Sequence, residues 1–287
     1  MDTTLTMEWV VVAVALLAAV VNGALGYGFS SITVPVALGF YANRVLNPGL
    51  VVLEVGLNAT SLFLNRKSVP AVWRHTLPII AGLFPGVALG SVVLGAVAAT
   101  PLKALTYAVL LPLILLQVSG RRFPIQHTRA AGFPFGAGLG VLYSTTTISG
   151  PPLALLFNNQ GLAQDEFRAA ISLVRVAESL LTLISYLLLG LVTAQSLTLS
   201  VWLLPAVVVG LPLGRQLISR ISKVWFGRVA MTVDAVLVTV GLSVALTQLG
   251  WVSNTVTSMT VAATAGFVAG MAWQRVVARR TTAVVTS

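Results

Sequence analysis

The sequence predicts an all-α polytopic membrane protein made of two inverted repeats, each a broken helical hairpin plus three transmembrane helices, with one extra C-terminal helix. Three observations support this: charge is scarce, the basic residues are grouped, and two segments are interrupted in the same way. The 287 residues are 57% hydrophobic and only 8% charged, whereas a soluble domain averages about a quarter charged residues. We assign 1–120 to the first membrane repeat, 121–250 to the second, and 251–287 to the extra helix and its short basic tail.

Uninterrupted apolar segments make up most of the chain. A transmembrane helix needs about 20 predominantly apolar residues to cross the hydrocarbon core. The apolar residues here come in long runs and not at the spacing of a single helix face, which favours membrane spans. Full spans are therefore expected at 47–65, 76–97, 101–119, 167–190, 195–215, 228–249 and 253–275.

Two further segments, 7–42 and 129–160, are too long for one crossing and short for two. Each is interrupted by glycine, serine, threonine and proline, as in Gly26-Tyr27-Gly28 of the first and Ser149-Gly150-Pro151-Pro152 of the second. Both segments are therefore predicted to be broken hairpins that enter and leave on the same side of the membrane.

The 17 basic residues indicate the orientation. Three loops and the C-terminal end, together with Arg168, hold 14 of them, and cytoplasmic loops carry the excess of lysine and arginine. Only Arg44 and Lys103 are expected on the periplasmic side of the membrane, and Arg175 lies within a span. We expect a multi-pass protein of the cell inner membrane with a periplasmic N-terminus and a cytoplasmic C-terminus, whose basic charge serves the lipid bilayer and not nucleic acid.

Short matches between the two halves indicate a repeat. Three pairs of segments correspond, at offsets of 117, 121 and 124 residues: Val34–Leu38 with Pro151–Leu155, Val52–Val55 with Leu173–Val176, and Gly86–Gly90 with Gly210–Gly214. The offsets drift only by small loop insertions. Because three spans follow each hairpin and three is odd, the second half begins on the opposite side of the membrane.

Broken helices in corresponding positions of two inverted halves are a sequence indicator of a transporter site. Unwound backbone is tolerated in lipid only where protein or a water-filled cavity satisfies it. Helix N-termini and free N–H groups at the midplane would suit a small anion. The substrate-binding candidates at the breaks are Gly26, Gly28, Ser30, Ser31, Thr33, Thr145, Thr146, Thr147, Ser149 and Gly150. In the alternative interpretation, these small residues only allow tight helix packing.

Ionisable residues lie inside the helix that follows each hairpin, where they usually face a cavity or a partner. Glu54 and Asn58 share one face of the first helix, and Arg175, Glu178 and Ser179 share one face of the second. One hypothesis pairs Glu54 with Arg175. Another makes Arg175, with Asn58 and Ser179, part of the anion site. Glu54 or Glu178 would then carry a coupling proton. In a third, Arg175 extends to the cytoplasmic surface.

Other functional groups are scarce. The chain has no cysteine and only two histidines, and both histidines stand beside arginines in predicted loops. We therefore expect no metal site, no cofactor and no catalytic residue. Arg215 ends a span and is assigned to a lipid-facing or interfacial position. For Asp234, structural pairing is favoured over a role as proton carrier.

The hairpin motifs are similar to those of a known family. Gly26-Tyr27-Gly28, Val34-Pro35 and Ser149-Gly150-Pro151-Pro152-Leu153-Ala154-Leu155, with the spans between them, resemble the TauE/SafE family of sulfite exporters and sulfonate permeases over about 8–248. The resemblance implies movement of sulfite or an organosulfonate, driven by an ion gradient. In two places, Phe29-Ser30-Ser31 and Tyr143-Ser144-Thr145-Thr146-Thr147, hydroxyls stand where the family usually has glycine, which could suit a different oxyanion.

The predicted function is therefore a secondary transporter for a small, sulfite-like or organosulfonate-like anion, with a coupling proton or ion. A passive anion channel or a membrane assembly protein would share the same helices. An intramembrane enzyme is disfavoured, because the sequence contains no HExxH, GxSxG or nucleotide-binding glycine loop. The direction of transport and the oligomeric state stay open.

Overall fold

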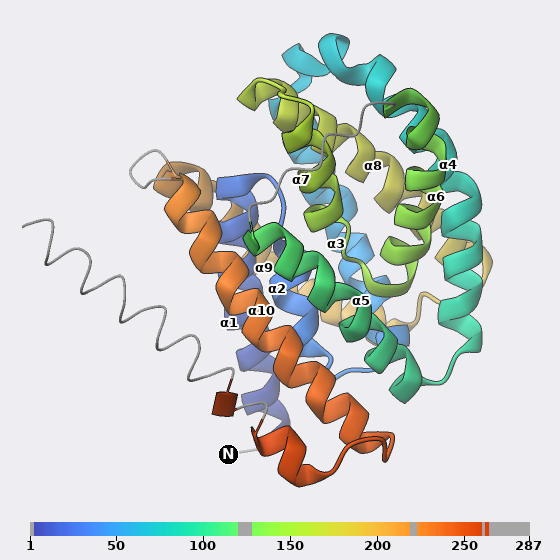
Figure 1. The fold of residues 1–287 in the computed structure, drawn as a ribbon, viewed down its shortest axis with the longest axis vertical. Coiled ribbons are helices and arrows are strands. Elements are labelled where there is room, and N and C mark those ends of the chain that lie inside the picture. Colours follow the sequence, from blue (N-terminus) through green and yellow to red (C-terminus); the bar gives the residue numbers. More distant parts are fainter. Residues whose placement is uncertain (1–2, 120–127, 219–222, 260–261, 264–287) are drawn as a thin grey trace, which may run out of the picture.

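The computed structural model describes residues 3–119, 128–218, 223–259 and 262–263, and all regular structure within these ranges is helical, as predicted. The helices pack into one bundle (Figure 1). In chain order they are α1 (Thr3–Leu25), α2 (Phe29–Ala37), α3 (Asn43–Leu64), α4 (Val69–Ala96), α5 (Ala99–Ser119), α6 (Thr128–Thr146), α7 (Gly150–Asn159), α8 (Gln164–Leu188), α9 (Ala194–Ile218) and α10 (Lys223–Gln248). A short 3-10 turn, η1 (Arg66–Ser68), precedes α4.

Five candidate membrane spans are found among the described residues, by length and composition. They are Glu8–Leu25, Asn43–Leu64, Arg66–Ala96, Gln164–Leu188 and Ala194–Leu217. Four coincide with predicted spans and the fifth is α1, so the chain is a multi-spanning membrane protein. Helices α5 and α10 occupy the predicted spans 101–119 and 228–249. Most of the predicted span 253–275 lies outside the described residues.

Each predicted interruption is a break in the helical backbone. Between α1 and α2, Gly26 and Gly28 have φ values of 88° and 106°, a left-handed conformation that glycine adopts without steric cost. Between α6 and α7 that conformation is adopted by Thr147, with a φ of 59°, which is uncommon for a β-branched residue. Gly150 then begins α7, and two prolines occupy its first turn, where a missing N–H costs little.

The first broken segment returns to the end of the bundle from which it starts. Glu8, in α1, and Tyr41, just after α2, line the same pocket. The two arms are unequal, however, because α1 has 23 residues and α2 has nine. The segment 7–42 was predicted to be too long for one crossing and short for two, and the structure divides it into α1, which is long enough to span the membrane, and the short α2.

The second broken segment folds back in a similar way. Gly132, near the beginning of α6, lies against Pro78 of α4. Phe157, near the end of α7, belongs to an apolar cluster with Val72, in the first turn of α4. Both ends of the segment therefore lie near the beginning of α4. Its arms have 19 and 10 residues.

Two helix pairs approach each other closely through glycine: α4 packs on α6, and α1 packs on α9. Figure 1 shows α4 and α6 side by side. A Cβ atom on Gly136 of α6 would lie 2.0 Å from the carbonyl oxygen of Ile79, and one on Gly214 of α9 would lie 1.9 Å from that of Val20. Small residues commonly allow such contacts between membrane helices, and Gly136 and Gly214 allow them here.

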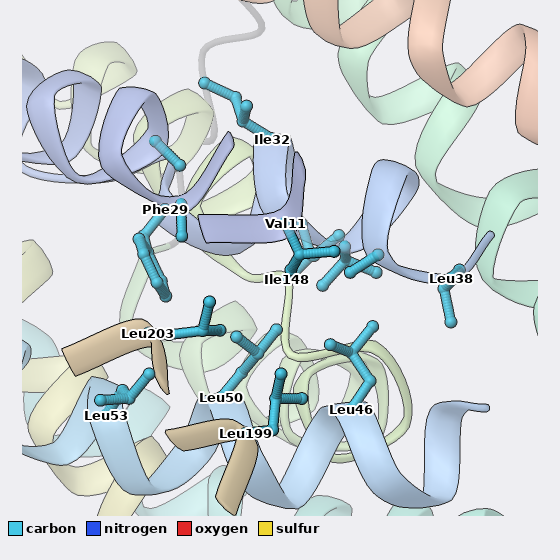
Figure 2. Packing of buried hydrophobic residues seen from close by; sticks show 14 of the residues in the cluster. Val11, Phe29, Ile32, Leu38, Leu46, Leu50, Leu53, Ile148, Leu199 and Leu203 are labelled. Atoms are coloured by element: carbon cyan, nitrogen blue, oxygen red, sulfur yellow. The ribbon is translucent and has the colours of Figure 1, made fainter. Parts of the chain in front are cut away.

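A buried apolar cluster joins the two halves of the chain. Figure 2 shows Leu46, Leu50 and Leu53 of α3 near Leu199 and Leu203 of α9. The same cluster contains side chains from the two breaks, Phe29 at the start of α2 and Ile148 between α6 and α7. The breaks are therefore held in the interior of the bundle, beside α3.

Candidate functional site

An ion pair between α3 and α8 lies at the centre of the bundle. The Nη2 atom of Arg175 donates to Oε1 of Glu54 over 2.8 Å, and the side chains are 2% and 0% exposed. The two residues are 121 positions apart, the offset predicted for the repeat. Arg175 therefore does not extend to the membrane surface. Desolvating both charges is costly unless the remaining polar atoms are also satisfied.

Glu54 meets that condition through residues beside both breaks. The hydroxyl of Ser30, in the first turn of α2, donates to Oε1 over 2.6 Å. The hydroxyl of Tyr143, in the last turn of α6, donates to Oε2 over 2.5 Å. With Arg175, the carboxylate accepts three hydrogen bonds. An ionised carboxylate only accepts, so this surrounding is suited to a charged Glu54.

The guanidinium group of Arg175 has hydrogen-bond partners for only part of its nitrogens. Among the residues that the structure describes, its Nε and Nη1 atoms are buried without a hydrogen-bond partner. Glu178, one turn further along α8, accepts a 2.5 Å hydrogen bond from the hydroxyl of Ser149 on Oε2, while its Oε1 is buried without a described partner. Buried polar atoms are normally paired, and each exception needs an explanation. The two free nitrogens of Arg175 lie on different edges of its guanidinium group, so each can donate a separate hydrogen bond to an anion.

The two breaks meet beside this cluster. A Cβ atom on Gly150 would lie 3.1 Å from Cβ of Tyr27, so the tips of the two broken segments are in contact. The amide of Asn47, on α3, donates to the carbonyl oxygen of Thr145 over 2.6 Å. The hydroxyl of Tyr186, on α8, donates to the carbonyl oxygen of Ser144 over 2.5 Å. Helices α3 and α8 therefore fix the second break from both sides.

The candidate hydroxyls at the second break have other partners. Those of Thr145 and Thr146 donate to carbonyl oxygens of the preceding turn, and that of Thr147 donates to the carbonyl oxygen of Thr146. All three threonine hydroxyls are therefore bonded to nearby backbone in this structure, and the part of these residues in substrate binding stays a prediction. In the first break, by contrast, the buried hydroxyl of Thr33 has no described partner, and Ser31 is buried.

Asn58 and Ser179 hold the backbone of α8 around Arg175. The hydroxyl of Ser179 donates to the carbonyl oxygen of Arg175 over 2.7 Å. The amide of Asn58 lies 3.3 Å from the same oxygen and 3.4 Å from the hydroxyl of Ser179. These contacts fix the part of α8 that carries the guanidinium.

Comparison with known proteins identifies the family. The family model described as "Sulfite exporter TauE/SafE" matches residues 11–243, which include both breaks and the buried ion pair. The chain belongs to the TauE/SafE family. A curated relative, the "Probable sulfite/organosulfonate exporter TauE" of Cupriavidus necator, is 29% identical over 233 residues, covering 79% of this chain and 90% of the relative. No solved structure matches.

Members of the TauE/SafE family are membrane transporters and not enzymes, so the predicted transport class is confirmed. The resemblance drawn from the hairpin motifs is confirmed as well.

Three residues near the first break were not recognised as site candidates in the sequence. Asn22 is 1% exposed and lines a pocket together with Arg168 and Arg215. Arg215 was assigned to a lipid-facing or interfacial position, and its place in this pocket, in the last turn of α9, favours the interfacial alternative. Asn22 could have been noticed as a lone amide inside an apolar run. The side chain of Asp234 lies outside those that the structure describes.

Proposed function

We propose that this chain is a secondary transporter that moves a small oxyanion, sulfite or an organosulfonate, across the cell inner membrane. The site lies between the two broken segments, at Arg175. The two unpartnered guanidinium nitrogens of this residue carry the proposal. A buried guanidinium that has its counter-charge in place and still carries free donors is suited to an anionic ligand.

Two further groups at the breaks are suited to binding an anion. The hydroxyl of Thr33 is buried without a described partner and can donate to a ligand oxygen. Ser149 precedes the N-terminus of α7, where unpaired backbone N–H groups and the helix dipole favour negative charge. An oxyanion held by such groups would replace its hydration shell with fixed donors, which keeps the site selective.

The order of the helices supports an inverted repeat. A long helix, a break, a short helix and three long helices occur twice, as α1–α5 and as α6–α10. The helix contacts also correspond between the halves. The first helix of each half packs on the fourth helix of the other, since α1 packs on α9 and α6 packs on α4. Rocking of one half against the other around a fixed central site is the alternating-access mechanism of such transporters. In this scheme the N-terminus is periplasmic and the C-terminus cytoplasmic.

Between the two acids, Glu178 is the proposed carrier of a coupling proton. Glu54 accepts three hydrogen bonds and acts as the fixed partner of Arg175. Glu178 has one oxygen bonded to Ser149 and one without a described partner. Protonation of Glu178 would remove a negative charge next to the incoming anion, so the proton and the anion would bind together.

The proposal is tested in proteoliposomes by following sulfite flux with and without a pH gradient. The purified protein should carry sulfite and respond to the gradient. A passive channel would give flux that follows the sulfite gradient alone.

Replacing Arg175 by Gln leaves the charge of Glu54 buried without its partner, which costs about 3–5 kcal/mol. The double variant Glu54→Gln with Arg175→Gln therefore tests the site without a lone buried charge.

The double variant should fold, give a thermal unfolding temperature near that of the wild type, and lose sulfite flux together with the part of the sulfite-dependent stabilisation that comes from the central site. A ligand that binds only the folded state raises the unfolding temperature. Arg74→Gln, which removes an exposed charge from α4, serves as the control and should behave as the wild type. Undiminished sulfite flux in the double variant would remove Arg175 from the transport site.

A further inference from the structure

The pocket lined by Asn22, Arg168 and Arg215 lies beside the first break. It is formed by α1, α3, α8 and α9, at the end of α3 that is next to Arg66 and Lys67. Its lining residues are Asn22, Gly23, Gly26, Ser61, Leu64, Asn65, Arg168, Ser172, Leu211 and Arg215. Neither Glu54 nor Arg175 is among them, so the pocket is separate from the buried ion pair.

The pocket is positively charged. Arg168 and Arg215 both line it, and no acidic residue is among its described lining residues. The Nη2 atom of Arg168 donates to the carbonyl oxygen of Ala24 over 2.7 Å. This hydrogen bond fixes the side chain at the end of α1. Asp165, one turn earlier on α8, is exposed. Two cations that face one small cavity without an acid inside it are suited to an anion.

Asn22 is the second, independent indication of a ligand. Its side chain is 1% exposed and lines the pocket, and neither its amide nitrogen nor its amide oxygen has a hydrogen-bond partner among the described residues. A buried amide without partners is unfavourable. The amide nitrogen can donate to an oxyanion held between the two arginines, which explains a polar residue at this place in an apolar helix.

Polar residues connect this pocket with the ion pair. On α3, Asn58 lies between Glu54 and the pocket residue Ser61, at helical spacing. On α8, Ser172 lines the pocket one turn before Arg175. The amide of Asn58 contacts the backbone of Arg175, so the two polar rows lie against each other between the two sites.

We propose that this pocket is a second binding site for a small inorganic oxyanion, an access site on the way to Arg175. Asn65 lines it and is followed directly by Arg66 and Lys67, and such basic loops face the cytoplasm. The pocket is therefore the cytoplasmic access site. Its role in the transport path depends on the proposed function, whereas its ability to bind an oxyanion does not.

The experiment measures sulfite binding to full-length protein in detergent by titration calorimetry. The background is the double variant Glu54→Gln with Arg175→Gln, in which the central site is removed and the pocket is intact. Two changes are introduced into this background: Arg215→Gln, and Asn22→Leu, which fills the same space without polar atoms. Arg74→Gln removes an equally basic, exposed residue outside the pocket and is the matched control.

The background protein should bind one sulfite, Arg215→Gln should weaken binding at least tenfold, and Arg74→Gln should leave it unchanged. Asn22→Leu should also weaken binding while raising the thermal unfolding temperature without sulfite, since an unpaired buried amide is lost. Absence of sulfite binding in the background, or equal binding in all variants, would overturn the pocket as an oxyanion site. Failure of the proposed function is seen separately, as absence of sulfite flux through the wild-type protein.

Discussion

Tyr143 and Tyr186 are both fully buried and each donates a hydrogen bond of 2.5 Å, but their acceptors differ in charge. Tyr143 donates to the carboxylate of Glu54, and Tyr186 donates to the backbone carbonyl of Ser144. Hydrogen bonds to charged groups contribute about 1.5–3 kcal/mol, and neutral ones about 1 kcal/mol. The same substitution at the two positions therefore separates the role of the ion pair from that of packing.

We expect Tyr143→Phe to lower stability by about 2 kcal/mol and Tyr186→Phe by about 1 kcal/mol. In addition, Tyr143→Phe should raise the KM for sulfite, because a Glu54 with fewer partners holds Arg175 less rigidly, whereas Tyr186→Phe should leave the KM unchanged. Thermal unfolding and initial flux in proteoliposomes measure the two effects. An identical KM in the two variants would contradict the part assigned to Tyr143.

Glu178 gives the prediction on coupling. Glu178→Gln keeps the shape of the side chain and its contact with Ser149 but cannot bind and release a proton. Sulfite flux through this variant should no longer respond to a pH gradient, while flux down the sulfite gradient continues. Asp165→Asn, at an exposed acid of the same helix, should retain the response. Wild-type dependence on the gradient in Glu178→Gln would exclude this residue as the proton carrier.

Individual site residues were predicted with mixed success. The pairing of Glu54 with Arg175 was one of the stated hypotheses, since both are ionisable residues placed at equivalent repeat positions in apolar helices. The hydroxyls of Thr145 and Thr146 could not be placed from the sequence, because a hydroxyl in a helix can bond either its own backbone or a ligand. Their backbone partners follow from side-chain conformations that the sequence does not specify.

Glycine spacing along α6 leads to a prediction about helix packing. Gly136 faces α4, where an added Cβ would lie 2.0 Å from the carbonyl oxygen of Ile79, while Gly138 is exposed and has nothing within 4 Å. Gly136→Ala should lower stability by about 1–3 kcal/mol through overpacking. Gly138→Ala should be neutral or stabilising by up to about 1 kcal/mol, because alanine is the better helix former.

Thermal unfolding of the two single variants measures this difference, with retention of a monodisperse peak on size exclusion as the check of folding. Both substitutions add one methyl group to the same helix, so their difference reports the contact with α4. Equal unfolding temperatures would show that α6 can move away from α4 at no cost, contrary to the close approach seen in the structure.

The breaks themselves were predictable, because glycine pairs and Pro-Pro interrupt a helix through local chemistry. The lengths of the arms were not. α1 extends over 23 residues and α2 over nine, and this asymmetry follows from where Gly26 and Gly28 adopt left-handed conformations. Thr147 is a clearer case, since its positive φ runs against the preference of a β-branched residue.

The orientation of the molecule as a whole can be tested by cysteine labelling, since the chain has no cysteine of its own. Lys67, Ala163 and Ala194 are exposed positions between helices or at their ends. In intact cells a membrane-impermeant maleimide should label Ala194→Cys, and it should label Lys67→Cys and Ala163→Cys only after lysis. Labelling of Lys67→Cys and Ala163→Cys from opposite sides would contradict the inverted repeat.

Composition and local pattern were sufficient for the membrane class, the number and placement of most helices, and both interruptions. These features depend on hydrophobicity and backbone chemistry, which act within some 20 consecutive residues. The free donors of Arg175, the saturation of Glu54 and the pocket of Asn22, Arg168 and Arg215 depend on packing between different helices, whose contacting residues lie 24 to 144 positions apart in the chain. Whether a polar atom finds a protein partner or is left for a ligand is settled only when those segments meet, because hydrogen bonds require contact within about 3 Å.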